Sequence, residues 1–141
     1  MRFSMFWQPK DSIGAEVVNE HGALTWNELH TPEVDAAAAF YSKLFGWKAN
    51  KMDMEGMSYT MFELNGRGIG GAMLPPMEGI PAHWQVYFSV DDTDKAVATA
   101  KKSGGTVLAD AVDLPDVGRM AALMDPQGAA FSVIKSASPT D

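Results

Sequence analysis

Three residues at alternating positions of one predicted strand carry most of the chemistry in this sequence. The stretch Leu24–His30 reads LTWNELH, and because side chains two apart on a strand share a face, Trp26, Glu28 and His30 are expected to point the same way. A carboxylate beside an imidazole can bind a divalent metal, and a carboxylate in a partly dry pocket can serve as a general base. This face is therefore either part of a metal site or the wall of a metal-free pocket.

The elements that must position these residues follow directly along the chain. Thr31 is expected to cap a helix whose first turn contains Pro32, and Gly46 is expected to end that helix in a left-handed conformation. Apolar residues within it recur every three or four positions, which predicts one buried face. Three strand-like runs then cover residues 47–54, 58–65 and 68–74. The glycine-rich last run predicts a bulge or a close backbone approach.

The same order of elements recurs after a proline-rich linker at residues 75–81. A strand at 83–90 leads into a helix that Asp91 or Asp92 caps and that runs to Lys102, and strands follow at 106–110, 117–124 and 129–135. A shift of 59 positions aligns residues 26–46 with residues 85–105 without a gap. The prediction is an α+β fold of two βαβββ units. Its parts are an arm (1–22), one domain (23–136, with units 23–74 and 82–136 around the linker) and a tail (137–141).

Composition excludes several classes of function. The 141 residues suit one domain, and 46% hydrophobic residues are enough for a packed core. The net charge of -7 argues against nucleic-acid binding, which needs clustered Lys and Arg. Without cysteine there is no thiolate nucleophile and no Cys-based metal site. No stretch has the length or apolarity of a membrane span or a signal peptide, so we expect a soluble cytoplasmic protein.

Four motifs in this order resemble the vicinal oxygen chelate superfamily, which includes glyoxalase I, bleomycin resistance proteins and extradiol dioxygenases. They are the strand-Thr-Pro-helix start, FYSKLFGW, the SVDD-helix-GG segment and the closing DPQG turn, and the resemblance covers residues 23–136. The chain looks most like the bacterial glyoxalase-like proteins. The resemblance implies that the two units form a curved sheet cup, that metal-binding members take ligands from the first and last strand of each unit, and that the protein is a homodimer.

In this sequence the implied metal positions hold unsuitable residues. The resemblance places them at Trp26, Gln85 and Ser132, with the fourth near Ala72 or Met73. An indole has no lone pair to give a metal, and glutamine and serine are poor ligands. We therefore expect no metal cofactor at the usual site. The alternative is a displaced divalent metal site built on Glu28 and His30, with His83 as a third member.

Our leading hypothesis is a glyoxalase-like or bleomycin-resistance-like protein that binds a small organic molecule in the cup without a metal. Its ligand contacts are predicted to be the following residues: Trp26, Glu28, His30, Met73, Gln85, Tyr87 and Ser132. If Glu28 is a catalytic base, the protein is a lyase or an isomerase. The alternative is a divalent-metal-dependent lyase or dioxygenase with non-standard ligands. A third hypothesis is a filled cup in a dimeric interaction module.

Overall fold

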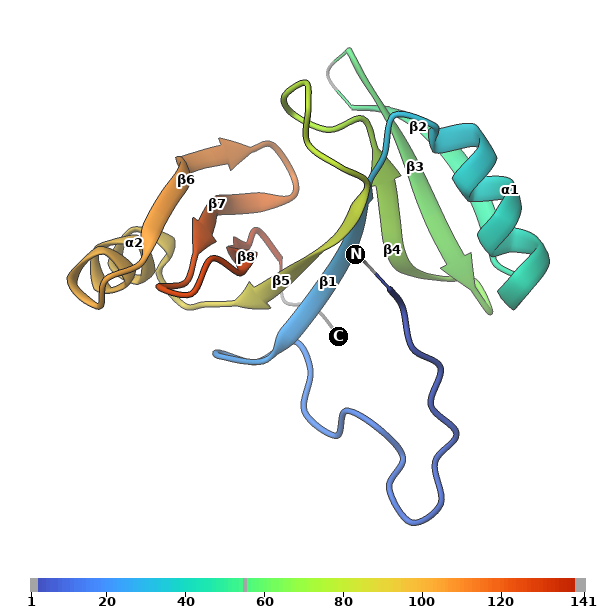
Figure 1. Ribbon diagram of the computed structural model, residues 1–141, viewed down its shortest axis with the longest axis horizontal. Coiled ribbons are helices and arrows are strands. Elements are labelled where there is room, and N and C mark those ends of the chain that lie inside the picture. The colour runs from blue at the N-terminus through green and yellow to red at the C-terminus, as the bar shows by residue number, and fades with distance from the viewer. Residues whose placement is uncertain (1–2, 55, 139–141) are drawn as a thin grey trace. The chain divides into compact units, whose positions relative to one another are not determined.

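The computed structural model describes residues 3–54 and 56–138. Parts of the predicted arm (1–2) and tail (139–141) therefore lie outside the described residues. The element order is β1-α1-β2-β3-β4 followed by β5-α2-β6-β7-β8, which is βαβββ twice (Figure 1). The predicted α+β class and the repeated βαβββ order are confirmed. How the arm, the linker and the tail divide the chain stays a prediction.

The chain forms two compact units, which we call the central unit (Trp26–Tyr87) and the terminal unit (Met1–Thr25 with Phe88–Asp141). The central unit takes most of β1 (Leu24–His30) and β5 (His83–Ser89), together with α1 (Val34–Phe45), β2 (Lys48–Met54), β3 (Met57–Leu64) and β4 (Arg67–Met73). Its strands run in the order β2-β3-β4-β1-β5. The β1–β4 pair is parallel, whereas the β2–β3 and β3–β4 pairs are antiparallel.

The terminal unit contains α2 (Thr93–Lys102), β6 (Thr106–Leu114), β7 (Gly118–Met124) and β8 (Ala130–Ser136). Its three strands form an antiparallel ladder in the order β8-β7-β6. Asp92 caps α2 as predicted, because its carboxylate accepts the backbone N–H of Lys95 at 2.9 Å. The core below α2 is made by Val97, Ala121, Leu123 and Val133.

The start of α1 differs from the prediction, which was wrong to place the helix cap at Thr31. The helix begins at Val34, and its cap residue Glu33 makes no side-chain capping bond. The reason is that the strand pairing continues through Thr31, whose N–H donates to the Met73 carbonyl at 3.0 Å. The chain leaves the sheet only after this bond, so the helix starts later. The predicted stop is confirmed, since Gly46 has φ of 72°.

Helix α1 covers one face of the central unit and leaves the Glu28 side chain on the other. The core between α1 and the strands of the central unit contains Leu29, Ala38, Phe62 and Ala72. Three aromatic side chains pack against these residues: Tyr41, Trp47 and Trp84. Side chains alternate along β1, so Leu29 on the helix side puts its neighbours Glu28 and His30 on the opposite face. The predicted alternation therefore holds.

The glycine-rich strand β4 contains the bulge predicted from its sequence. Phe62 pairs with Gly70 and Glu63 pairs with Gly68, so Ile69 is the extra residue. A Cβ atom at residue 70 would lie 2.9 Å from the Asn27 carbonyl oxygen. The close backbone approach that glycine permits is therefore present too.

The arm carries large apolar side chains at its surface. An isolated bridge joins Val18 to Leu24, and Phe3, Met5, Phe6, Trp7 and Ile13 are each more than half exposed.

Among the described helices, none combines the length and apolarity needed to span a membrane.

Candidate functional site

A buried carboxylate lies at the centre of the face that α1 leaves free. Glu28 and His30 on β1 are each 8% exposed. The Tyr87 hydroxyl donates to Glu28 Oε1 at 2.9 Å, and His30 Nε2 lies 2.8 Å from the same oxygen. A carboxylate oxygen accepts in such a contact, so His30 Nε2 is the donor. One oxygen of Glu28 is thus held by donors from two strands.

Tyr59 on β3 extends this network towards Trp26. The indole N–H of Trp26 donates to the Tyr59 hydroxyl at 3.0 Å. Burial raises the pKa of Tyr59 above its ordinary value of 10, and the negative charge of Glu28 raises it further. Tyr59 therefore stays a neutral phenol, able to donate its own proton, over the whole physiological pH range.

His83 and Gln85 continue the polar face along β5. The rings of His30 and His83 meet edge to face, with 5.1 Å between centroids and 79° between planes. His83 Nδ1 donates to the Pro81 carbonyl oxygen at 2.9 Å, and its Nε2 lies 3.1 Å from Gln85 Oε1. Because residues 83, 85 and 87 alternate with Trp84, they share the face of Glu28.

The structure brings together five of the side chains that sequence reasoning selected: Trp26, Glu28, His30, Gln85 and Tyr87. Met73 lies beside His30 in the register of the parallel β1–β4 pair and is partly buried. Ser132 belongs to the terminal unit, where it is 1% exposed on β8 and pairs with Ala122. That these residues contact a ligand stays a prediction.

Tyr59 is the member of this network that the sequence-based site did not include. It lies on β3, which is neither the first nor the last strand of its unit, whereas the family resemblance implies ligands only on those two strands. The signal was nonetheless present, because a strand with Tyr59 and Met61 two apart runs beside a strand rich in glycine. The Tyr59 ring occupies the space that a side chain at residue 71 would fill. The sequence offered His83 as a possible third metal ligand and as a residue facing the cup. In the structure its ring nitrogens lie within hydrogen-bond distance of the Pro81 carbonyl oxygen and Gln85 Oε1.

The residues at the expected metal positions do not fit a divalent ion. Trp26 uses its only polar atom to donate to Tyr59, and an indole N–H has no lone pair for a metal. Glu28 and His30 are bonded directly to each other, which leaves no gap for an ion between them. Across residues 3–54 and 56–138, no three His, Asp or Glu side chains are grouped as a metal site requires.

The fold and this site define a class of protein. The chain belongs to the Glyoxalase/Bleomycin resistance protein/Dioxygenase superfamily, whose family model matches residues 23–133. Among its relatives is the protein named "Putative glyoxylase CFP32" of Mycobacterium tuberculosis, which is 48% identical over 132 residues, 93% of this chain and 51% of that protein. The "Anthracycline biosynthesis protein DnrV" of Streptomyces peucetius is 35% identical over 127 residues, 79% of this chain and 46% of that protein. The chain thus spans about half the length of these relatives.

Solved structures with the same fold include methylmalonyl-CoA epimerases. A variant of the Streptomyces coelicolor enzyme, in complex with 2-nitronate-propionyl-CoA, matches with a TM-score of 0.64 and 19% identity over 86% of this chain and 99% of that one. The Mycobacterium tuberculosis enzyme matches with a TM-score of 0.58 and 15% identity over 82% of this chain and 88% of that one. At these identities the likeness shows the fold alone.

Proposed function

We propose that this chain binds a small organic carbonyl compound on the Glu28 face of the central unit without a metal ion. The observation that carries the proposal is the buried Glu28 carboxylate, held by Tyr87 and His30 on the face that α1 leaves free. Burying a charge is costly unless it is paired or hydrogen-bonded. Groups kept in such an environment are often there for function.

The donors around Glu28 suit a ligand that carries oxygen atoms. Tyr59 is a neutral hydroxyl, Tyr87 donates through its hydroxyl, and His30 offers an N–H. Such donors can turn from the carboxylate to a carbonyl oxygen, while Glu28 accepts from a ligand hydroxyl. The names of the relatives and the contents of the neighbouring structures agree with this chemistry, since anthracyclines and CoA thioesters both carry carbonyl groups.

A second candidate function is proton transfer, which the short contact between Glu28 and His30 favours. Glu28 would take a proton from a carbon next to a carbonyl group, leaving the electron pair as an enolate. Tyr59 or Tyr87 would donate a hydrogen bond to the enolate oxygen, the role that a metal ion fills elsewhere. His30, bonded to Glu28 at 2.8 Å, would hold the carboxylate in position. The protein would then be a lyase or an isomerase.

Calorimetric titration of chelator-treated protein tests the binding proposal. The probes are methylmalonyl-CoA and a soluble hydroxyanthraquinone, applied to the wild type, Glu28→Gln and Glu78→Gln. Glu78 is exposed, so the same change there is the matched control. We expect saturable binding that Glu28→Gln weakens and Glu78→Gln leaves intact. Equal binding by both variants would place the ligand elsewhere.

Two further measurements separate the alternatives. Exchange of the acidic C–H of a bound probe with deuterated water, lost in Glu28→Gln, would support proton transfer. Stoichiometric Ni²⁺, Zn²⁺ or Mn²⁺ binding that Glu28→Gln abolishes would instead support the metal-dependent alternative and overturn our proposal. A homodimer and a cytoplasmic location stay predictions, and sedimentation velocity tests the first of them.

A further inference from the structure

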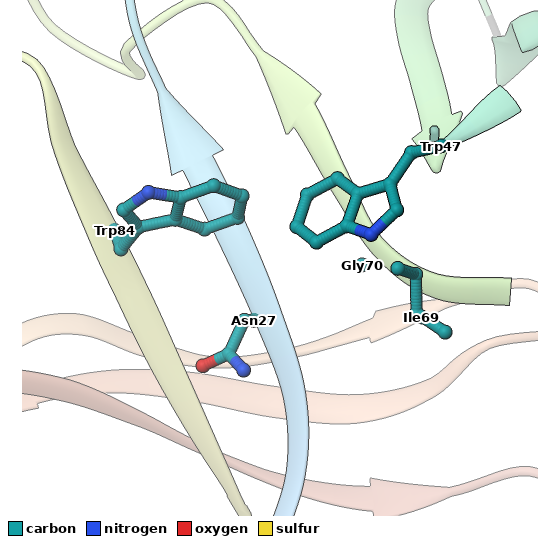
Figure 2. A pocket seen from close by; sticks show the side chains of 5 residues that line it. All are labelled: Asn27, Trp47, Ile69, Gly70 and Trp84. Atoms are coloured by element: carbon teal, nitrogen blue, oxygen red, sulfur yellow. The ribbon is translucent and has the colours of Figure 1, made fainter. Parts of the chain in front are cut away.

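A cavity lies on the opposite face of the central unit from Glu28. Its volume is about 430 Å³, and it is lined by Asn27, Trp47, Ile69, Gly70 and Trp84 (Figure 2). Asn27 precedes Glu28 on β1, and neighbouring side chains on a strand point to opposite faces. Trp47, Ile69 and Trp84 belong to the core on the α1 side. The cavity is therefore separate from the site proposed above.

Both indoles of this cavity are fixed by their neighbours. Trp84 donates its N–H to the Tyr41 hydroxyl at 3.0 Å. Trp47 stacks on Phe45, with 4.7 Å between ring centroids and 28° between planes. The two indoles lie at 87° to each other with 6.4 Å between centroids, and Figure 2 shows both of them above the Asn27 amide. The aromatic walls are thus ordered before any ligand arrives, which lowers the entropic cost of binding.

The Asn27 amide is the polar group of the cavity. Its side chain is half-buried and makes no hydrogen bond to any other described residue. An amide offers a donor and an acceptor side by side. The β4 bulge places Ile69 and Gly70 together in the lining, and a Cβ atom on residue 70 would lie 2.9 Å from the Asn27 carbonyl oxygen. Glycine at this position therefore permits the close approach of β4 to the β1 backbone at Asn27.

We propose that this cavity binds a neutral, flat heterocycle whose edge carries a hydrogen-bond donor next to an acceptor. Indole faces favour flat aromatic rings by stacking. An asparagine amide pairs with a donor–acceptor edge in two parallel hydrogen bonds, as it does with the edge of adenine. None of the five lining residues is charged, which favours a neutral ligand over an ionic one. The volume suits one small ring system.

Calorimetric titration with adenine and with purine tests the proposal, because purine has the same rings without the amino donor. We expect wild-type protein to bind adenine more tightly than purine. Asn27→Leu keeps the approximate volume and removes the amide, so it should weaken adenine binding at least about tenfold, the equivalent of one good hydrogen bond. Trp47→Leu should weaken both probes. Glu28→Gln, on the other face, should change neither.

The folding of Asn27→Leu is checked separately from its binding. Since the Asn27 amide has no partner among the described residues, Asn27→Leu should retain the wild-type circular dichroism spectrum and unfolding midpoint. The proposal is overturned if the wild type shows no saturable adenine binding, if purine binds equally well, or if Asn27→Leu binds adenine like the wild type. It is also overturned if adenine binding falls as the protein self-associates, because this face would then be an interface between copies.

Discussion

The Tyr59 hydroxyl occupies the place where a Cβ atom on Gly71 would be. Glu28 is the register partner of Gly71 in the parallel β1–β4 pair, so Tyr59 reaches across β4 to the edge of the Glu28 network. Glycine is required there because the tyrosine ring needs the space above the strand, whereas the backbone angles at this residue are ordinary. A side chain at residue 71 and the bond from Trp26 to Tyr59 are therefore mutually exclusive.

Gly71→Ala should destabilise the protein by about 1–3 kcal/mol, the usual cost of overpacking a buried site. The added methyl group must displace Tyr59 and break its bond with Trp26. Chemical denaturation measures the effect. In a Tyr59→Ala background the space is free, so the same substitution should cost little. Equal costs in the two backgrounds would show that the Tyr59–Gly71 contact is not the cause.

Tyr59 should make the folded protein sensitive to alkali. Its pKa is raised in the folded state, whereas the unfolded chain ionises near 10. A raised pKa contributes stability that is complete below the unfolded value and is lost as the pH rises towards the folded value. The free energy of unfolding should therefore decline above pH 10 in the wild type. Tyr59→Phe should show a shallower decline, and its tyrosinate absorbance should lack the last ionisation step. Identical alkaline profiles would contradict this account.

Two buried threonines provide an opposed pair of predictions. Thr60 and Thr93 are each 1% exposed. Thr60 Oγ1 has no hydrogen-bond partner among the described residues, whereas the Thr93 hydroxyl donates to the Arg119 carbonyl at 2.6 Å and accepts the Lys135 N–H at 3.2 Å. Thr60→Val should stabilise the protein by about 1 kcal/mol, because it removes an unsatisfied polar atom. Thr93→Val should destabilise it by about 1–3 kcal/mol.

Thermal and urea unfolding of both valine variants decides this pair. Both substitutions replace a buried threonine by valine. If one variant is stabilised and the other destabilised, intrinsic strand or helix preference therefore explains little of that difference. Loss of stability in Thr60→Val would mean that its hydroxyl finds a partner, such as a bound water, in solution.

Much of the fold was predictable because it depends on local periodicity. Alternation along LTWNELH and the positive φ of Gly46 are properties of short segments. The helix start was missed because it depends on a distant partner: the Thr31 N–H bonds to Met73, some forty residues later, and this bond holds the chain in the sheet. No local pattern contains that information.

The candidate site was predictable to the same extent. Glu28 and His30 follow from the strand period, and Tyr87 follows from the 59-residue shift between the units. Tyr59 depends on the register of β3 against β4 and on a missing side chain at Gly71, which periodicity cannot supply. The cavity lined by Trp47 and Trp84 likewise depends on the β4 bulge. The glycine-rich run predicted that a bulge is present, but it did not indicate at which residue the bulge lies.

The Arg119 guanidinium in the terminal unit should give the protein a stability term that acid removes. It donates to both oxygens of Asp94, at 2.8 and 2.9 Å, and to Asp113 at 2.9 Å. The hydrogen bonds from Arg119 hold the pKa of Asp94 below its ordinary value of 3.8. A lowered pKa of Asp94 contributes stability above the unfolded pKa, and this stability is lost as the pH falls through the folded pKa.

Arg119→Met should therefore lower the unfolding midpoint at neutral pH, by a small amount because the pair is exposed to solvent. The difference from wild type should vanish in acid below the folded pKa of Asp94, and Lys10→Met, in the exposed arm, should show no such pH dependence. A deficit in Arg119→Met that persists unchanged in acid would assign the effect to packing of the arginine stem instead.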